Sequence, residues 1–466
     1  MIKTAQPYGA FAKTMLEPQK YPDLRLYPGG PPKPPYDVTG HTLWMLMGVQ
    51  VDEIEKPFEA DLADVTKQDS MLVGMAPARW AYLVGPESNA GFLLVAKLQA
   101  AHVPVYRAAA AFESAGRSFA PGTWIVPTSV DATRIVKDVL GTGLHVDGAD
   151  RPIVVDAYRL KPDTRIGLWR GANNMPGGWL KWTFEQYGFN HRQVSAADFG
   201  GDLSSLYDTI VLPDGMTRDA VVRGLDPQRN DKEWAWAYGV GEGGWKKLGD
   251  WVRGGGTLVA IGSGVETARD LFDLPIEKAL PETSRRGGRG RGAGAATGAA
   301  PQPDANRVLR QAFSSPAELD AALRERVIDP TTLFYCPGSL LQNEFNPAHP
   351  VAFGMPPAWP VFFESDQAYR LKPGFTIQSE VVARYPKEGK ILRSGWLLGE
   401  DLLRDQANVV AFRVGKGYVV TMGSQIDFRA QARATYKLLF NAMFHGPSTL
   451  VPAAELARVT TATGSR

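Results

Sequence analysis

The sequence predicts an α/β fold: a doubly wound, mostly parallel sheet, preceded by a smaller α/β unit. Strands and helices alternate from residue 165 onward at the spacing of β-α-β units. The apolar residues in the helices have a helical period, and glycines follow their ends. The predicted strands are residues 166–169, 208–214 and 257–261, and the predicted helices are 178–187, 243–252 and 265–271.

Residues 76–160 predict the smaller α/β unit. Continuous apolar runs indicate strands, and residues 91–101 carry apolar side chains at helical spacing. The predicted strands are 81–84, 103–106 and 123–126. Residues 2–16 echo residues 126–140, where a strand turns into a helix that ends in a leucine. We therefore expect residues 1–75 to be the remnant of a preceding α/β unit, whose opening strands would lie before Met1, plus a connection rich in proline.

The rest of the chain is interpreted as one large domain, residues 161–450, and a tail, residues 451–466. Residues 284–303 are dominated by Arg, Gly and Ala, so we expect a disordered insertion. After it, the apolar patterns predict strands at 333–336 and 361–363, a hairpin of 409–414 with 418–422, and a helix over 430–445.

Composition argues against several classes of partner. The formal net charge is +2, so there is no overall field to attract nucleic acid or an anionic membrane. No apolar run approaches the roughly 18–20 residues that span a bilayer, and the first residues lack the apolar core of a signal peptide. The single cysteine excludes an internal disulfide. None of this determines the compartment.

No metal or cofactor site is predicted. The six histidines are scattered, and none lies in a His-Glu-x-x-His motif. Each is interpreted as a surface or internally hydrogen-bonded histidine. The tract at residues 285–292 could bind RNA, but a flexible insertion is the preferred interpretation.

Two residues are candidate nucleophiles. Ser263 lies in the turn after strand 257–261, where a nucleophile elbow would lie, but Ile261 and Val265 replace the glycines of the G-x-S-x-G pattern. A helix N-cap is the preferred role of this serine. Cys336 has only His349 as a potential base nearby in sequence, so a buried structural cysteine is preferred.

A candidate ligand crevice is predicted at the carboxyl edge of the larger sheet. Open α/β sheets bind ligands outside the carboxyl ends of their strands. The polar residues that follow these strand ends are Asn173, Asn174, Asp214, Ser263 and Glu266.

Several segments resemble the carboxyl-terminal half of bacterial proteins of the carboxypeptidase A-like zinc metallopeptidase family. They span most of the chain: residues 5–13, 35–43, 47–49, 185–189, 255–260, 336–339 and 436–442. The resemblance implies that residues 161–450 are similar to a class I glutamine amidotransferase, with a flavodoxin-like fold. The nucleophilic cysteine of that class is missing, because Ser263 occupies the corresponding turn. The zinc ligands of the family belong to a peptidase domain that this sequence does not contain.

These observations predict an accessory or binding region of a zinc carboxypeptidase-like protein, without catalysis of its own. Its expected partners are a peptidase domain, or a peptide or glycan ligand. The alternative is an α/β hydrolase or amidotransferase-like enzyme that uses Ser263 or Cys336. The resembled family is exported, whereas no export signal is predicted in this sequence.

Overall fold

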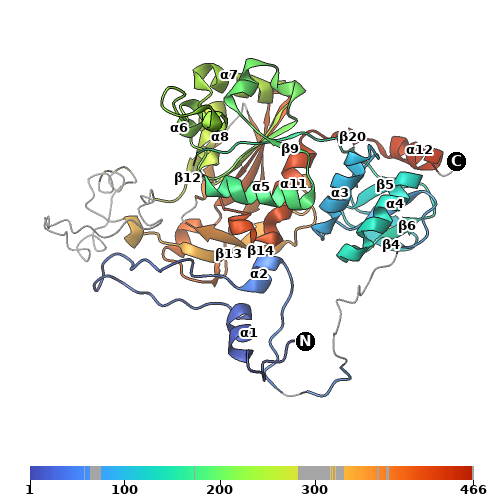
Figure 1. Cartoon of the computed structure of the whole chain (residues 1–466). Helices are drawn as coiled ribbons and strands as arrows, with labels where there is room; N and C mark the ends of the chain where they lie inside the picture. The colour runs from blue at the N-terminus through green and yellow to red at the C-terminus, as the bar shows by residue number, and fades with distance from the viewer. Residues whose placement is uncertain are drawn as a thin grey trace.

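The chain forms an α/β structure built around two sheets (Figure 1). The computed structural model describes residues 1–56, 58–62, 75–172, 174–281, 315, 317, 321, 330–364, 367–373 and 377–463. A 6-stranded sheet forms the smaller domain and a 12-stranded sheet the larger one. The expected α/β class is confirmed. The predicted insertion at residues 284–303 lies outside the described residues.

Five parallel strands form one half of the larger sheet. They lie in the order β9-β8-β10-β11-β19, and each pair of neighbours is parallel. Numbered along the chain, this order is 2-1-3-4-5, so the winding reverses between β8 and β10. Strands β10 and β11 are buried at every residue, which explains their continuous apolar sequences. The strands are β8 (Ile166–Leu168), β9 (His191–Gln193), β10 (Thr209–Leu212), β11 (Thr257–Ile261) and β19 (Gly417–Met422).

Helices cover both faces of this parallel half. Alternate residues of a strand point to opposite faces: Val211 and Val259 pack with helices α5 and α11, whereas Ile210 and Leu258 pack with α6, α7 and α8. The larger domain is therefore doubly wound here. The helices are α5 (Met175–Tyr187), α6 (Arg218–Val222), α7 (Gly241–Gly254), α8 (Gly264–Phe272) and α11 (Tyr436–His445).

The other half of the sheet is antiparallel, so the expectation of a mostly parallel sheet holds only for the half from β9 to β19. The turn at Gly415 (φ +62°) reverses the chain and pairs β18 with β19, as the predicted hairpin requires. The expected strand at 333–336 is wrong: the strand begins at Pro337, and Tyr335 makes only an isolated bridge to Leu398. The strands are β12 (Ile276–Lys278), β13 (Pro337–Phe345), β14 (Ala358–Glu364), β15 (Tyr369–Leu371), β16 (Gln378–Arg384), β17 (Leu392–Ser394) and β18 (Ala407–Val414).

The smaller domain has a split β-α-β topology. Strands β1 and β2 both pair antiparallel with β5, so they run parallel to each other with β5 between them. The order β2-β5-β1-β6, with a helix after β1 and another after β5, is the ferredoxin-like arrangement. Its elements are β1 (Ala81–Val84), α3 (Ala90–Ala100), β2 (Tyr106–Ala108), β5 (Trp124–Pro127), α4 (Val130–Val139), β6 (Asp147–Ala149) and β7 (Ala157–Arg159), with a separate ribbon of β3 (Phe112–Ser114) and β4 (Arg117–Phe119).

The last part of the chain returns to the smaller domain. We expected a tail from residue 451, but β20 (Thr449–Val451) pairs with β7 and helix α12 (Ala453–Thr463) follows it. Val451 and Leu456 are buried in the core of that domain. Figure 1 shows the red carboxyl-terminal helix beside the blue-green small domain. Residues 451–463 therefore complete the sheet and its core.

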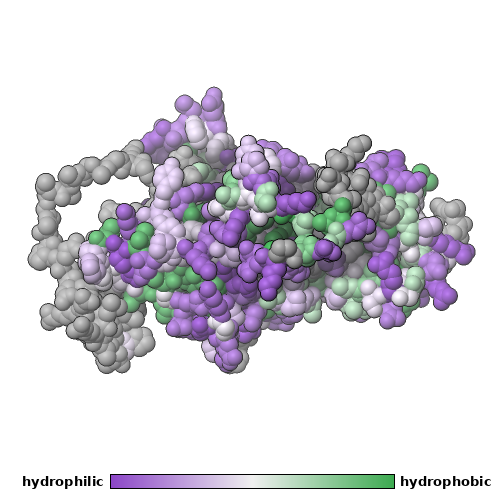
Figure 2. Space-filling model, turned by 90° about the horizontal axis from the view of Figure 1, so that it is seen from below, coloured by the Kyte–Doolittle hydropathy of each residue, from purple (hydrophilic) through white to green (hydrophobic). Residues whose placement is uncertain are grey.

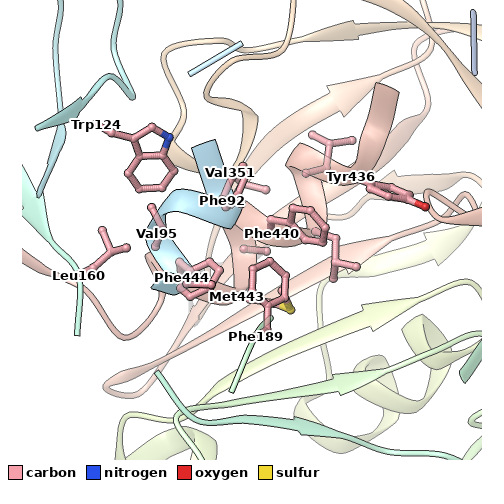
Figure 3. Close-up of a cluster of buried hydrophobic side chains, with 14 of the residues drawn as sticks. Phe92, Val95, Trp124, Leu160, Phe189, Val351, Tyr436, Phe440, Met443 and Phe444 are labelled. Carbon is pink, nitrogen blue, oxygen red and sulfur yellow. The ribbon is translucent and has the colours of Figure 1, made fainter. Parts of the chain in front are cut away.

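The two domains share one apolar core (Figure 3). Phe92 of α3 lies edge-to-face with Phe440 of α11, with ring centroids 5.1 Å apart. Phe92 also stacks on Phe444 of α11, with ring centroids 6.2 Å apart. Because these aromatic contacts cross between the sheets, the domains are packed as one body rather than joined only by a linker.

The amino-terminal segment contains helices α1 (Gly9–Leu16) and α2 (Leu43–Met47). No strand is assigned to residues 1–8, so the echo of residues 126–140 extends to the helix but not to a strand. None of the helices in the described residues is long and apolar enough to cross a membrane. Short 3-10 turns occur at Leu140–Thr142, Ala196–Gly200, Leu203–Ser205, Lys232–Ala237, Pro330–Thr332, Pro350–Ala352, Glu400–Leu403, Phe428–Ala430 and Arg433–Thr435.

Candidate functional site

Polar side chains gather where the parallel strands end. Strands β8, β10, β11 and β19 all run in one direction, so their carboxyl ends meet at one edge of the sheet. The reversal of winding between β8 and β10 lies at the same edge, where α/β folds bind ligands. The polar residues that follow these strands and are joined by hydrogen bonds are Asn174, Asp214, Ser263 and Gln425. Asp427 lies close enough to Asp214 for the charge of Asp214 to act on it.

Asp214 is the centre of this network. Its Oδ1 accepts hydrogen bonds from the backbone nitrogen of Ser263 (2.9 Å) and from its Oγ (2.8 Å). Its Oδ2 accepts one from Nε2 of Gln425 at 3.2 Å, and its backbone oxygen accepts one from Nδ2 of Asn174 at 3.0 Å. Asp214 is buried. Through its carboxylate and its backbone oxygen, Asp214 therefore links the ends of four strands.

The backbone around Asp214 is shaped to allow these contacts. Gly262 has φ +57°, and a Cβ at this position would come within 2.7 Å of Oδ1 of Asp214. Asn174 caps helix α5, since its Oδ1 accepts a hydrogen bond from the backbone nitrogen of Gly177 at 2.8 Å. Three of the five predicted crevice residues, Asn174, Asp214 and Ser263, are thus in direct contact.

Ser263 is held by hydrogen bonds rather than activated. Its hydroxyl donates to Asp214 and accepts from the backbone nitrogen of Gly215 at 2.7 Å. A serine nucleophile needs a base that removes its proton, and no histidine of the described residues contacts Ser263. The side chain makes no cap hydrogen bond to helix α8, although Ser263 occupies the N-cap position. Its hydroxyl instead connects, by hydrogen bonds, the turn after β11 to the turn after β10.

Cys336 lies elsewhere, in a separate apolar cluster. It is 2% exposed, and its Sγ lies 3.7 Å from the carbonyl oxygen of Phe363. His349, the base considered for it, accepts a hydrogen bond from the backbone nitrogen of Val351 and lies 3.5 Å from the Tyr418 hydroxyl. The thiol is therefore buried in the way expected of a structural cysteine.

The remaining two predicted crevice residues are not part of the network. Asn173 lies outside the described residues. Glu266 forms ion pairs with Arg269 (2.6 Å) and Lys278 (3.8 Å). It lies in the first turn of α8, three residues beyond Ser263, and these two ion-pair partners are on α8 and β12 rather than at the strand ends.

Asp427 is a polar residue of this sheet edge that the sequence interpretation missed. It lies in the loop five residues beyond the end of β19, whereas Asp214 lies two residues beyond β10, and it is 3% exposed. Burial raises the pKa of its carboxyl to about 7, and the nearby charge of Asp214 acts in the same direction. Its Oδ2 has no hydrogen-bond partner among the described residues. The rule that selected Asp214, a carboxylate just after a buried parallel strand, could have found it only if it were extended farther into the loop.

The backbone after Asp427 is strained. Arg429 (φ +53°) and Ala430 (φ +56°) are consecutive non-glycine residues in the left-handed region. Arg429 makes two hydrogen bonds to the carboxylate of Asp37, at 2.8 and 2.5 Å, and Phe428 stacks on Phe362 at 4.0 Å. These contacts hold the turn in place and tie the amino-terminal segment to this edge of the sheet.

The network can supply hydrogen bonds but offers no metal site. No cluster of three or more His, Cys, Asp or Glu side chains suited to a metal ion occurs in the described part of the chain. Its candidate nucleophile is already engaged, and its main carboxylate already accepts three side-chain or backbone hydrogen bonds through Oδ1 and Oδ2. The arrangement is therefore suited to organising the sheet edge.

Comparisons with known proteins give no family. No family model matches the chain, and no curated protein does. Solved structures with some similarity include a ThuA-like protein from Bacteroides uniformis (12% identity, 63% of this chain and 91% of that one, TM-score 0.28). Others are a cytoplasmic protein from Salmonella typhimurium (11%, 60% and 97%, 0.30) and a Thermoplasma acidophilum protein described as part of a GMP synthase (9%, 60% and 92%, 0.29). At these TM-scores the similarities carry no argument about function.

Proposed function

We propose that this chain is a non-catalytic accessory region that docks against the peptidase domain of a zinc carboxypeptidase-like protein. The proposal rests on the amino-terminal segment, which is placed on the larger domain but leaves its apolar side chains in solvent. Tyr8 is 75% exposed, Phe11 66%, Leu26 60% and Ile54 59%. Figure 2, which views the molecule from below, shows apolar residues in green among hydrophilic ones on the visible face.

The amino-terminal segment is held in place by hydrogen bonds. Nε1 of Trp44 donates a hydrogen bond to the carbonyl oxygen of Leu16 at 2.8 Å, and the backbone nitrogen of Gln19 donates one to Oγ of Ser394 at 2.9 Å. Helix α1 is therefore held close to α2, while the apolar side chains named above remain exposed to solvent. Figure 1 shows α1 extending below the body of the molecule. An anchored segment with exposed aromatic side chains is typical of an interaction surface.

We further propose that the larger domain is flavodoxin-like and related to class I glutamine amidotransferases, without their chemistry. The strand order 2-1-3-4-5 supports the flavodoxin-like assignment. The hydrogen-bonded Ser263 in the elbow turn supports the loss of catalysis. The hydrolytic alternative lacks, among the described residues, the histidine base of a serine hydrolase at Ser263, whose hydroxyl donates to Asp214 instead.

Complex formation tests the docking proposal. The chain is mixed with a carboxypeptidase A-like peptidase domain from the same genome, and association is measured by sedimentation velocity. We expect a 1:1 complex that Tyr8→Asp or Phe11→Asp weakens at least tenfold, because each places a charge in an apolar interface. Val154→Asp is the matched control, since Val154 is 70% exposed on the smaller domain.

Two outcomes would overturn the proposal. One is the absence of any complex at concentrations up to about 100 µM, a weak limit for a specific interface. The other is equal weakening by the Val154→Asp control. Hydrolysis of peptide, ester and glutamine substrates that is lost in Ser263→Ala or Cys336→Ala would favour the enzyme instead.

A further inference from the structure

Arg170 is a cation at the carboxyl edge of the parallel strands. It lies two residues beyond the end of β8, where the winding of the sheet reverses. Its Nε is buried and has no hydrogen-bond partner among the described residues. The two terminal nitrogens are not enclosed, and no hydrogen bond or ion pair joins them to the part of the chain that the structure describes. The outer edge of the guanidinium is therefore available to a ligand.

Packing holds this guanidinium in place. Its carbon lies 5.4 Å from the ring centroid of Trp236, which belongs to the turn Lys232–Ala237. The stem of the side chain lies against the first turn of α5, where a Cβ on Gly177 would come within 2.9 Å of Cγ of Arg170. A side chain that is ordered before it binds a ligand loses little further conformational entropy on binding.

Two tryptophans beside Arg170 offer an apolar surface. The ring centroids of Trp234 and Trp236 are 5.7 Å apart, and the ring planes are inclined by 32°. Trp234 is 42% exposed. Its turn is nevertheless held in place, because the backbone nitrogen of Trp234 and the hydroxyl of Tyr238 both donate to the backbone oxygen of Asp231 at 2.9 Å. A fixed and exposed aromatic surface beside a cation is typical of a binding site.

The charge at this edge suits a ligand with one negative charge. Arg192 of β9 is paired with Asp198 at 2.9 Å, and Arg218 of α6 is paired with Glu242 at 2.7 Å. Of these three arginines, Arg170 is therefore the one whose charge is not already balanced. A planar guanidinium can donate two parallel hydrogen bonds to a carboxylate, which matches its charge. A phosphate dianion would keep one negative charge unmatched.

We propose that Arg170 and the pair Trp234 and Trp236 bind the carboxyl end of a peptide. Nη1 and Nη2 of Arg170 donate to the free α-carboxylate, and the tryptophan rings pack on an apolar side chain of the last peptide residue. The choice of a peptide rests on the proposed function, because a carboxypeptidase acts at the free carboxyl end of peptide chains.

Calorimetric titration of the full chain tests this site. The ligands are a Gly-Gly-Phe tripeptide with a free carboxyl group, the same tripeptide as its carboxyl-terminal amide, and Gly-Gly-Gly as the free acid. The free acid should bind at least tenfold more tightly than the amide, which has no charge to pair with Arg170. It should also bind at least threefold more tightly than Gly-Gly-Gly, which has no side chain to pack on the tryptophans.

Variants assign these preferences to the named side chains. Arg170→Gln should remove the preference for the free acid, and Arg170→Lys should keep only part of it, because an ammonium group lacks the planar pair of donors. Arg218→Gln is the matched control, since Arg218 also lies over a tryptophan, Trp245, at 5.4 Å but is paired with Glu242. If Arg170→Gln does not fold, Trp234→Ala keeps the guanidinium and should remove the preference for phenylalanine over glycine.

Three outcomes would overturn the proposal. They are equal binding of the free acid and the amide, an equal loss of binding in Arg218→Gln, and binding of glucuronic acid as tight as that of the peptide, which would assign the site to acidic sugars. The titrations use this chain without a peptidase domain, so their failure does not count against the docking of the amino-terminal segment. Tyr8→Asp, which should weaken docking, should leave peptide binding unchanged, so the two proposals fail separately.

Discussion

The buried carboxyl of Asp427 should make the protein less stable as the pH rises from 4 to 7. Its pKa is about 7 in the folded protein, whereas an unfolded aspartate titrates near ~3.9. The native state therefore keeps this proton over a range in which the unfolded chain has lost it, and stability falls with rising pH. A difference of about 3 units corresponds to about 4 kcal/mol, which is the cost of deprotonating Asp427 in place.

Asp427→Asn removes this cost, because the amide stays neutral. We expect the variant to match the wild type within about 1 kcal/mol at pH 4 and to be more stable by about 3–4 kcal/mol at pH 8. Urea denaturation at pH 4, 6 and 8 measures the difference. A stability difference that stays constant across this range would refute the reasoning, since it would show that Asp427 does not titrate with a raised pKa.

Asp208 provides a control of opposite sign. Burial alone would raise the pKa of Asp208, but hydrogen bonds from Arg165 and Lys161 lower it below its ordinary value. Its contribution to stability is therefore present above the unfolded pKa of ~3.9 and is lost as the pH falls through its folded pKa. Asp208→Asn should be destabilising at pH 7, and its deficit should shrink below pH 4.

Three further predictions concern the packing of the core and the hydrogen-bond network around Asp214. Ser263→Ala removes one hydrogen-bond partner from the buried Asp214 and one from the Gly215 nitrogen. It should therefore lower the free energy of unfolding by about 1–2 kcal/mol, measured by urea denaturation, and should leave any hydrolysis of peptide, ester or glutamine substrates unchanged. Phe440→Ala should lower the free energy of unfolding by about 3–5 kcal/mol in the same measurement, because Phe440 is fully buried between the domains. Leu456→Ala should lower the free energy of unfolding by about 2–4 kcal/mol. It should also speed hydrogen exchange in β7, since Leu456 is buried in the core of the smaller domain.

Local patterns predicted the parallel part of the fold well. Residues 257–261 were expected as a strand and form β11 with the same bounds, and the expected strand at 208–214 contains β10. Strands buried on both faces have continuous apolar sequences, and this signal does not depend on their neighbours. Asn174, Asp214 and Ser263, which the rule for carboxyl ends grouped, are joined by hydrogen bonds, because that rule depends only on the strands being parallel.

Features that depend on distant pairing were not predictable in this way. Strand β20 is only three residues long, and it is a strand because β7 provides an edge nearly three hundred residues earlier in the chain. The strand order of the smaller sheet likewise depends on distant pairing, because β5 lies between β1 and β2. Asp427 was missed for a different reason: it lies five residues beyond the end of β19, farther from its strand than Asp214 is, and its raised pKa depends on burial that a sequence pattern does not reveal.

Helix α11 connects this edge of the larger sheet to the smaller domain. Near its start, Tyr436 lies close enough to Asp427 for that charge, in addition to burial, to raise the tyrosine pKa. Just past its middle, Asn441 accepts a hydrogen bond from Arg107 of strand β2 and donates to the carbonyl oxygens of Val351 and Phe353 at 3.0 and 2.8 Å. With a rise of about 1.5 Å per residue, the helix from Tyr436 to Asn441 spans only about 8 Å.

The core contacts of α11 keep that separation fixed, so the helix gives the two domains one rigid support. Phe440, midway along the helix, packs on Phe92 of the smaller domain and on Phe189 of the larger one. Arg107→Met removes the hydrogen bond to Asn441 and should therefore also loosen the start of the helix near Asp427. The variant should then speed hydrogen exchange along the whole of α11, and a change confined to the residues around Asn441 would show that the helix does not transmit the constraint.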